Sequence, residues 1–156
     1  MEGRYAAQAM PGTHVFCACR AVNAGTAMPH IIAEYSANLE DRLDVQALVD
    51  DLHQAAIDSA VAELVGIRSR AVRREHFRVA DGNPANGFVH IVARLRRGRS
   101  PDQRKALGQA LLAAADKRLA NVYPSHPIAM TVEVHEIDPD MTFRRNTLRE
   151  RAERAA

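Results

Sequence analysis

The chain has 156 residues, a length that suits a single domain built around one hydrophobic core. Lysine and arginine number 21 against 19 for aspartate and glutamate, and a formal net charge of only +2 argues against nucleic acid as a partner. No apolar run approaches the roughly 20 residues that a membrane-spanning helix needs, so we expect no membrane association either.

Cysteine usage and the first residues favour a cytoplasmic protein. Cys17 and Cys19 are separated by one residue, and so small a ring would strain a disulfide between them. A second cysteine pair that could complete a zinc site is absent from the sequence. Residues 1–27 also lack the continuous apolar segment of a secretory signal.

The chain begins with a segment that shows neither a helical nor a strand period. Residues 1–27 mix glycine, proline and alanine, and they are interpreted as a disordered extension, an added segment or a misassigned start. The run from Pro29 to Ser36 is apolar and β-branched, which predicts a short strand. Its proline stands at the first position, where a missing N–H costs a sheet little.

An amphipathic helix is predicted next. Apolar residues recur at steps of three and four over residues 45–64, and Gly66 ends the pattern. Residues 67–79 are rich in arginine with apolar residues between, which predicts one long or two short strands. Residues 81–87 combine aspartate, asparagine, glycine and proline, a composition typical of turns.

A second set of the same elements follows. Residues 88–95 are apolar enough to form a central strand. Ser100 and Gln103 have the spacing of a capping box, and Pro101 stands at the favoured first helical position. These residues predict a helix that begins here and extends to Val122.

The last predicted strand covers residues 128–137, where apolar and polar residues alternate. Residues 141–149 are expected to add a short edge element, and residues 148–156 to form a charged tail.

The order strand, helix, strand therefore occurs twice, which predicts an α+β fold with two βαβ repeats. Each crossover is long enough to place its two strands in parallel with a right-handed connection. Two such repeats make a four-stranded sheet with both helices on one face. We expect the other face to be apolar and uncovered, and therefore to need a second copy of the chain.

Met28 stands directly before Pro29, and this pair offers a possible catalytic base. If translation starts at Met28, or if the chain is cut after it, Pro29 becomes an amino-terminal secondary amine. An internal proline has an amide nitrogen with neither a basic lone pair nor a proton. The alternative is that Pro29 simply begins a strand.

Arginine dominates the basic residues, since only Lys105 and Lys117 are lysines among the 21. Guanidinium groups suit bidentate binding of carboxylates or phosphates. Most of these arginines are interpreted as solvated surface residues, including Arg73, Arg74, Arg78, Arg149, Arg151 and Arg154.

Five short motifs occur in one order along the chain. They are Met-Pro-His-Ile-Ile-Ala-Glu at 28–34, Gly-Ile-Arg-Ser-Arg at 66–70, Ala-Asp-Gly at 80–82, Phe-Val-His at 88–90 and Gly-Arg-Ser at 98–100. Together they resemble the 5-carboxymethyl-2-hydroxymuconate delta-isomerase family of the tautomerase superfamily. The resemblance covers residues 28–147, including Phe143 and Asn146.

The resemblance implies a homotrimer with an amino-terminal proline as catalytic base and no cofactor. It makes Pro29 the base, and Arg68 and Arg99 the residues that bind a small polycarboxylate substrate. The implied reaction converts the dienol 5-carboxymethyl-2-hydroxymuconate into its conjugated 2-oxo-3-ene isomer, in the breakdown of 4-hydroxyphenylacetate through homoprotocatechuate.

The residues are compatible with this chemistry. An α-amino group has a pKa near 8, and nearby guanidinium charge or an apolar wall lowers the pKa of an amine toward the working pH of a general base. His30 adjoins Pro29 and is the histidine best placed to influence its protonation. Two alternatives remain: a tautomerase for another 2-oxo acid, and a non-catalytic trimeric binding protein in which Pro29 stays internal.

Overall fold

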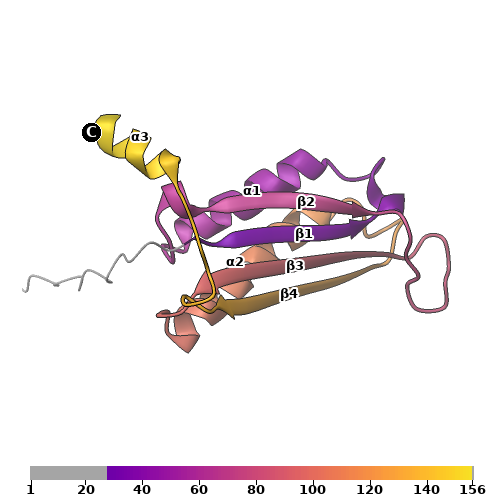
Figure 1. The fold of residues 1–156 in the computed structure, drawn as a ribbon. Helices are drawn as coiled ribbons and strands as arrows, with labels where there is room; N and C mark the ends of the chain where they lie inside the picture. The colour runs from indigo at the N-terminus through magenta and orange to yellow at the C-terminus, as the bar shows by residue number, and fades with distance from the viewer. Residues whose placement is uncertain (1–27, 156) are drawn as a thin grey trace, which may run out of the picture.

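A computed structural model of the chain describes residues 28–155, so the predicted extension at 1–27 lies outside the described residues. The described chain forms four strands, three α-helices and two short 3-10 turns (Figure 1). In chain order they are β1 (His30–Ser36), η1 (Ala37–Leu39), α1 (Val45–Asp58), η2 (Leu64–Gly66), β2 (Arg68–Arg74), β3 (Gly87–Arg96), α2 (Pro101–Leu119), β4 (Ile128–Ile137) and α3 (Thr147–Ala155).

The four strands form one mixed sheet in the order β2-β1-β3-β4. β1 pairs with β2 in parallel, β3 pairs with β4 in parallel, and the two halves meet through the antiparallel pair β1 and β3. The predicted pair of βαβ repeats is therefore confirmed. Because the halves run in opposite directions, the starts of β1 and β2 lie at the same end of the sheet as the ends of β3 and β4.

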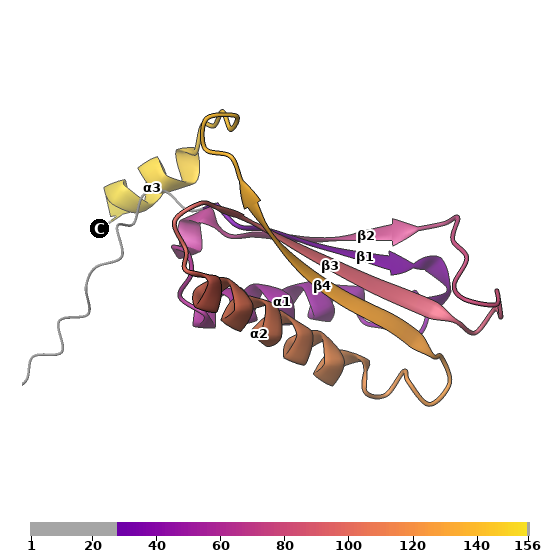
Figure 2. The same ribbon diagram turned by 90° about the horizontal axis from the view of Figure 1, so that it is seen from below.

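The core lies between the sheet and the two long helices, which cover the same face (Figure 2). Alternate residues of the central strands β1 and β3 point into it, as period-two patterning requires. The helices contribute residues at three- and four-residue steps. The fully buried members include Ile31, Ala33, Val89, Ile91 and Ala93 from the sheet and Leu48, Leu52, Leu107, Leu111 and Ala115 from the helices.

The two long helices begin at capping residues. The Asp44 side chain accepts a hydrogen bond from Ala47 N at 2.9 Å at the start of α1. At α2 the predicted capping box is present: Ser100 Oγ accepts from Gln103 N, and Gln103 Oε1 accepts from Ser100 N. These bonds satisfy amide groups that have no partner within the helix.

Three segments differ from the prediction. α1 ends at Asp58 rather than at residue 64, because Ala60 adopts a positive φ of 51° that no α-helix accommodates. β2 ends at Arg74, and the chain then forms a loop that Asn86 holds by donating to Val79 O and Asp81 Oδ1. Instead of a short edge element and a tail, the end of the chain forms α3.

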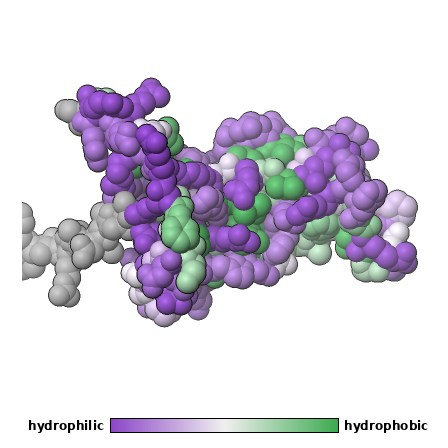
Figure 3. All heavy atoms as spheres, viewed as in Figure 1, coloured by the Kyte–Doolittle hydropathy of each residue, from purple (hydrophilic) through white to green (hydrophobic). Residues whose placement is uncertain are grey.

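The face of the sheet opposite α1 and α2 is not the apolar surface that the sequence predicted. Every second residue of its strands points away from the helices, and many of these residues are charged or titratable: His30, Glu34, Arg68, Arg70, Arg74, His90, Arg94, Glu133 and His135. Figure 3 shows hydrophilic and hydrophobic side chains mixed on this face. We call it the open face.

The charged residues of the open face pair with one another, both across neighbouring strands and within β4. Arg74 makes two hydrogen bonds with the carboxylate of Glu34, and Glu133 accepts from His135 at 2.6 Å and lies 3.4 Å from His90. These contacts lower the pKa of Glu34, through Arg74, and of Glu133, chiefly through His135.

No helix within residues 28–155 is long and apolar enough to cross a membrane.

Candidate active site

Pro29 directly precedes β1 at the end of the sheet where β2 also starts. Its side chain is fully buried, and its carbonyl oxygen accepts a hydrogen bond from the backbone N–H of Arg68 at 3.0 Å. This bond places the first residues of the two parallel strands side by side. In the chain as described, Met28 precedes Pro29, so the proline nitrogen is part of an amide.

Arg68 is the first residue of β2, and its guanidinium reaches back toward the turn before it. Arg68 Nη1 donates to the carbonyl oxygen of Gly66 at 2.9 Å. Arg68 is paired with His30 in the register of β1 and β2, so both side chains belong to the open face. A guanidinium carries five N–H donors, so donors remain for a carboxylate.

Arg99 lies in the connection between β3 and α2, immediately before the α2 capping residue. Arg99 Nε donates to Val61 O at 2.9 Å, and Nη1 lies 3.5 Å from Arg96 O. Val61 and Gly66 both belong to the segment between α1 and β2, residues 59–67, which we call the η2 loop. The structure therefore brings the predicted residues Pro29, Arg68 and Arg99 to one end of the sheet, with both guanidiniums held by the same loop.

The electrostatic character of this end is positive. His30 lies opposite Arg68 on β2 and Arg94 on β3. Burial, together with the charges of Arg68, Arg70 and Arg94, lowers the pKa of His30 below 6.5. A field that disfavours the imidazolium form also disfavours protonation of an amine nearby and attracts carboxylates.

Several residues near the site could not be assigned to it from the sequence. Arg149, which the sequence suggested to be a surface residue, forms an ion pair with Glu63 of the η2 loop. Asn146 Nδ2 donates to Val65 O of the same loop at 3.3 Å. Burial and the charges of Arg96 and Arg149 lower the pKa of Arg144. These contacts join residues about 80 positions apart, and no local pattern predicts such a pairing.

Arg74, which the sequence likewise predicts to be a solvated surface residue, forms an ion pair with Glu34. This pair lies on the open face at the far end of β1 and β2 from Pro29. It is part of the sheet's cross-strand charge pairing rather than of the candidate site.

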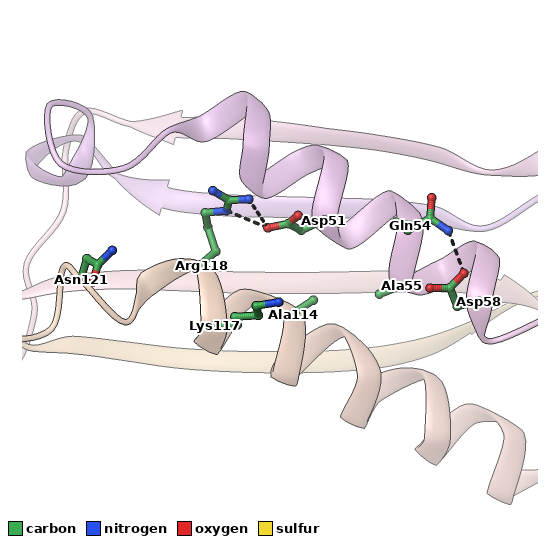
Figure 4. Close-up of a pocket in the computed structure, with 8 residues that line it drawn as sticks. All are labelled: Asp51, Gln54, Ala55, Asp58, Ala114, Lys117, Arg118 and Asn121. Atoms are coloured by element: carbon green, nitrogen blue, oxygen red, sulfur yellow. Dashed lines mark hydrogen bonds and ion pairs between the residues drawn. The ribbon is translucent and has the colours of Figure 1, made fainter.

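A separate groove lies between α1 and α2 on the outer side of the helices (Figure 4). Its charged and polar side chains interact with one another. Arg118 Nη2 lies 2.6 Å from Asp51 Oδ2, and Gln54 Nε2 donates to Asp58 Oδ1 at 2.7 Å. None of Pro29, Arg68 and Arg99 lines this groove, so it is not the site that the sequence predicted.

Within residues 28–155, no group of three or more histidine, cysteine, aspartate or glutamate side chains is arranged to hold a metal ion.

Comparison with known proteins decides the family. Residues 29–152 match the sequence model of the 5-carboxymethyl-2-hydroxymuconate isomerase family. The chain belongs to this family. The resemblance that the five motifs predicted is therefore confirmed, and the match begins at Pro29 itself.

Individual members of the isomerase family agree with this assignment. The 5-carboxymethyl-2-hydroxymuconate Delta-isomerase of Escherichia coli is 28% identical over 121 residues, which covers 78% of this chain and 96% of that protein. The crystal structure of a 5-carboxymethyl-2-hydroxymuconate isomerase from Deinococcus radiodurans R1 superposes with a TM-score of 0.76 at 27% identity, covering 81% of this chain and 96% of that one.

The same fold occurs in more distant solved structures. A solved structure described as a fused 4-OT wild type symmetric trimer has a TM-score of 0.57 at 19% identity, and the match covers 75% of this chain and 92% of that one. At this identity the likeness shows the fold alone.

Proposed function

We propose that the protein, when its chain begins at Pro29, isomerises 5-carboxymethyl-2-hydroxymuconate to the conjugated 2-oxo-3-ene isomer. This reaction belongs to the breakdown of 4-hydroxyphenylacetate through homoprotocatechuate. The observation that supports the proposal most directly is the meeting of Pro29, Arg68 and Arg99 at one end of the sheet, in a family whose members are named for this substrate.

The proposed mechanism moves one proton. The amino-terminal Pro29 nitrogen accepts the proton of the dienol hydroxyl, the oxygen becomes the carbonyl of the 2-oxo group, and a proton is added to carbon as the double bonds shift. Arg68 and Arg99 bind substrate carboxylates through the N–H groups that the η2 loop does not use. Their charges, with the burial of the proline ring, keep a useful fraction of the amine neutral near pH 7.

The mechanism requires a free amine at Pro29. Synthesis from Met28 would supply one, because methionine before a small residue such as proline is removed by cellular aminopeptidase. A family match that begins at Pro29 supports such a start. If residues 1–28 stay attached in the cell, the proline nitrogen remains an amide, and the protein is a non-catalytic binding protein instead.

The proposal includes a homotrimer. The open face has no helix packed along it within residues 28–155, and it still carries partly exposed apolar side chains such as Val72 and Val92 between its charged groups. A surface of this kind gains stability when a second copy of the chain covers it. A solved structure with the same fold is described as a fused symmetric trimer.

A direct experiment compares three proteins: one produced from Met28 and trimmed to Pro29, the same protein carrying Pro29→Ala, and the full 156-residue chain. We expect the first to convert the dienol to the enone, and the other two to be slower by about 100-fold or more, as is typical when a general base is lost. Mass spectrometry establishes the first residue of each. Equal rates for the trimmed protein and its Pro29→Ala variant would contradict the proposed base.

The substrate class is tested by comparing kcat/KM for dienols with one, two and three carboxylates. We expect the tricarboxylate to be preferred, and Arg68→Ala and Arg99→Ala to reduce that preference mainly through KM. A preference for a smaller 2-oxo acid would retain the proline base and change the assigned substrate.

A further inference from the structure

The η2 loop receives contacts from four side chains that come from three different parts of the chain. Arg68 and Arg99 donate to the carbonyl oxygens of Gly66 and Val61, both at 2.9 Å. The other two side chains come from the end of the chain: Asn146 donates to Val65 O, and Arg149 pairs with the carboxylate of Glu63. The residues that would bind substrate and the C-terminal segment are therefore joined through one short loop.

Asn146 and Arg149 contact the η2 loop at its exposed middle, where few of its side chains are buried in the core. Val61 and Ile67, at its two ends, are buried with 5% and 7% of their surface exposed. Between them Ala62 packs against the core, but Leu64 is 61% exposed, so residues 63–65 have little apolar anchorage. Glu63 and Val65, the two points that α3 and Asn146 contact, flank this exposed residue.

The path of the chain explains how these contacts arise. After β4 the chain leaves the sheet at the end where β1 and β2 start, and it returns toward β2 to form α3 (Figure 1). Asn146 connects α3 to the η2 loop, because its Oδ1 accepts a hydrogen bond from Leu148 N in the first turn of α3 while its Nδ2 donates to Val65 O of the loop. One side chain thus fixes the start of the helix against the η2 loop.

We infer that Asn146 and Arg149 are positioning residues for the proposed reaction, because they hold the η2 loop that orients the guanidiniums of Arg68 and Arg99. This inference rests on the proposed function and assigns a role to α3, a helix outside the sheet and its two covering helices. Loss of either contact frees the middle of the loop, so its carbonyl groups no longer fix the two guanidiniums for the substrate carboxylates.

The test measures kcat and KM for 5-carboxymethyl-2-hydroxymuconate in the protein that begins at Pro29. Arg149→Ala is expected to raise KM about threefold to tenfold while kcat changes less than about twofold, since carboxylate binding weakens and the base is untouched. Arg151→Ala is the matched control, because Arg151 is an exposed residue of the same helix with no ion pair within residues 28–155. It should leave both constants unchanged.

Two further variants separate positioning from simple stabilisation of α3. Asn146→Asp keeps an oxygen for the α3 cap and removes the donor to Val65 O, so it should raise KM while α3 stays folded. The exchange of charges in the double variant Glu63→Arg, Arg149→Glu should recover most of the affinity lost in either single variant. A double variant as weak as the sum of the singles would overturn the inference.

Amide hydrogen exchange supplies a readout that does not depend on activity. In the full chain, Arg149→Ala should speed exchange in residues 59–67 by about threefold or more, while Arg151→Ala should not. Unchanged exchange and unchanged KM in Arg149→Ala overturn the inference. If the unsubstituted protein does not isomerise the dienol, the proposed function fails, and exchange in residues 59–67 still decides whether α3 holds the loop.

Discussion

At the scale of single residues, His30 reports the field at the candidate site. It follows Pro29 directly, and the sheet register places Arg68 and Arg94 on either side of it. Burial and these positive charges lower its pKa, so the ring is mostly neutral at pH 7. In the unfolded chain the histidine regains its ordinary pKa of about 6.5. Its contribution to stability is therefore full above pH 6.5 and is lost as pH falls toward the lower pKa of the folded state.

Replacing Arg94 with glutamine should raise the pKa of His30 toward its ordinary value, because one positive charge opposite the imidazole is removed. The titration is measured by NMR of the histidine ring protons, with His30→Gln used to assign the signal. Arg97→Gln is the control, since Arg97 is exposed beyond the end of β3, and it should leave the midpoint unchanged. A midpoint at or above 6.5 in the unsubstituted protein would contradict the positive field.

At the scale of elements, short sequence motifs predicted those helix ends that depend only on neighbouring residues. The capping box of α2 is formed by residues three positions apart, and the structure has it as the sequence predicted. The predicted end of α1 was wrong, because the apolar periodicity of the sequence continues past Asp58 whereas the backbone turns at Ala60. The sequence did not predict α3 for another reason: its contact with Glu63, and the contact of the preceding Asn146 with Val65, depend on tertiary packing.

Ser100→Ala should lower the free energy of unfolding by about 1 kcal/mol, because the amide of Gln103 loses its acceptor at the start of α2. Ser100→Thr keeps an acceptor oxygen and should cost less. Chemical denaturation at a fixed protein concentration measures both, since stability of an assembly depends on concentration. Equal transition midpoints for the serine and alanine proteins would show that the cap contributes nothing.

At the scale of the whole molecule, the position of the candidate site follows from the antiparallel joining of the two βαβ halves. The first half supplies Pro29 and Arg68, and the connection after β3 supplies Arg99. The motifs predicted these three residues, but only the topology shows why they meet. The open face was predicted less well, because the apolar character of 29–36 and 88–95 concealed the polar residues at outward positions, such as Glu34, His90 and Arg94.

If the open face is the surface between subunits of the proposed trimer, one added charge at its centre should prevent assembly. Val92 lies on this face in β3, between Ile32 of β1 and Glu133 of β4. Val92→Glu places a second carboxylate beside Glu133, and removing it from water between subunits costs several kcal/mol, more than a contact with neighbouring Arg94 is expected to recover. Ala113→Glu adds the same charge at an exposed position of α2, on the opposite side of the molecule. Sedimentation velocity should show a trimer for the unsubstituted and Ala113→Glu proteins and smaller species for Val92→Glu, whereas an intact Val92→Glu trimer would place the interface elsewhere.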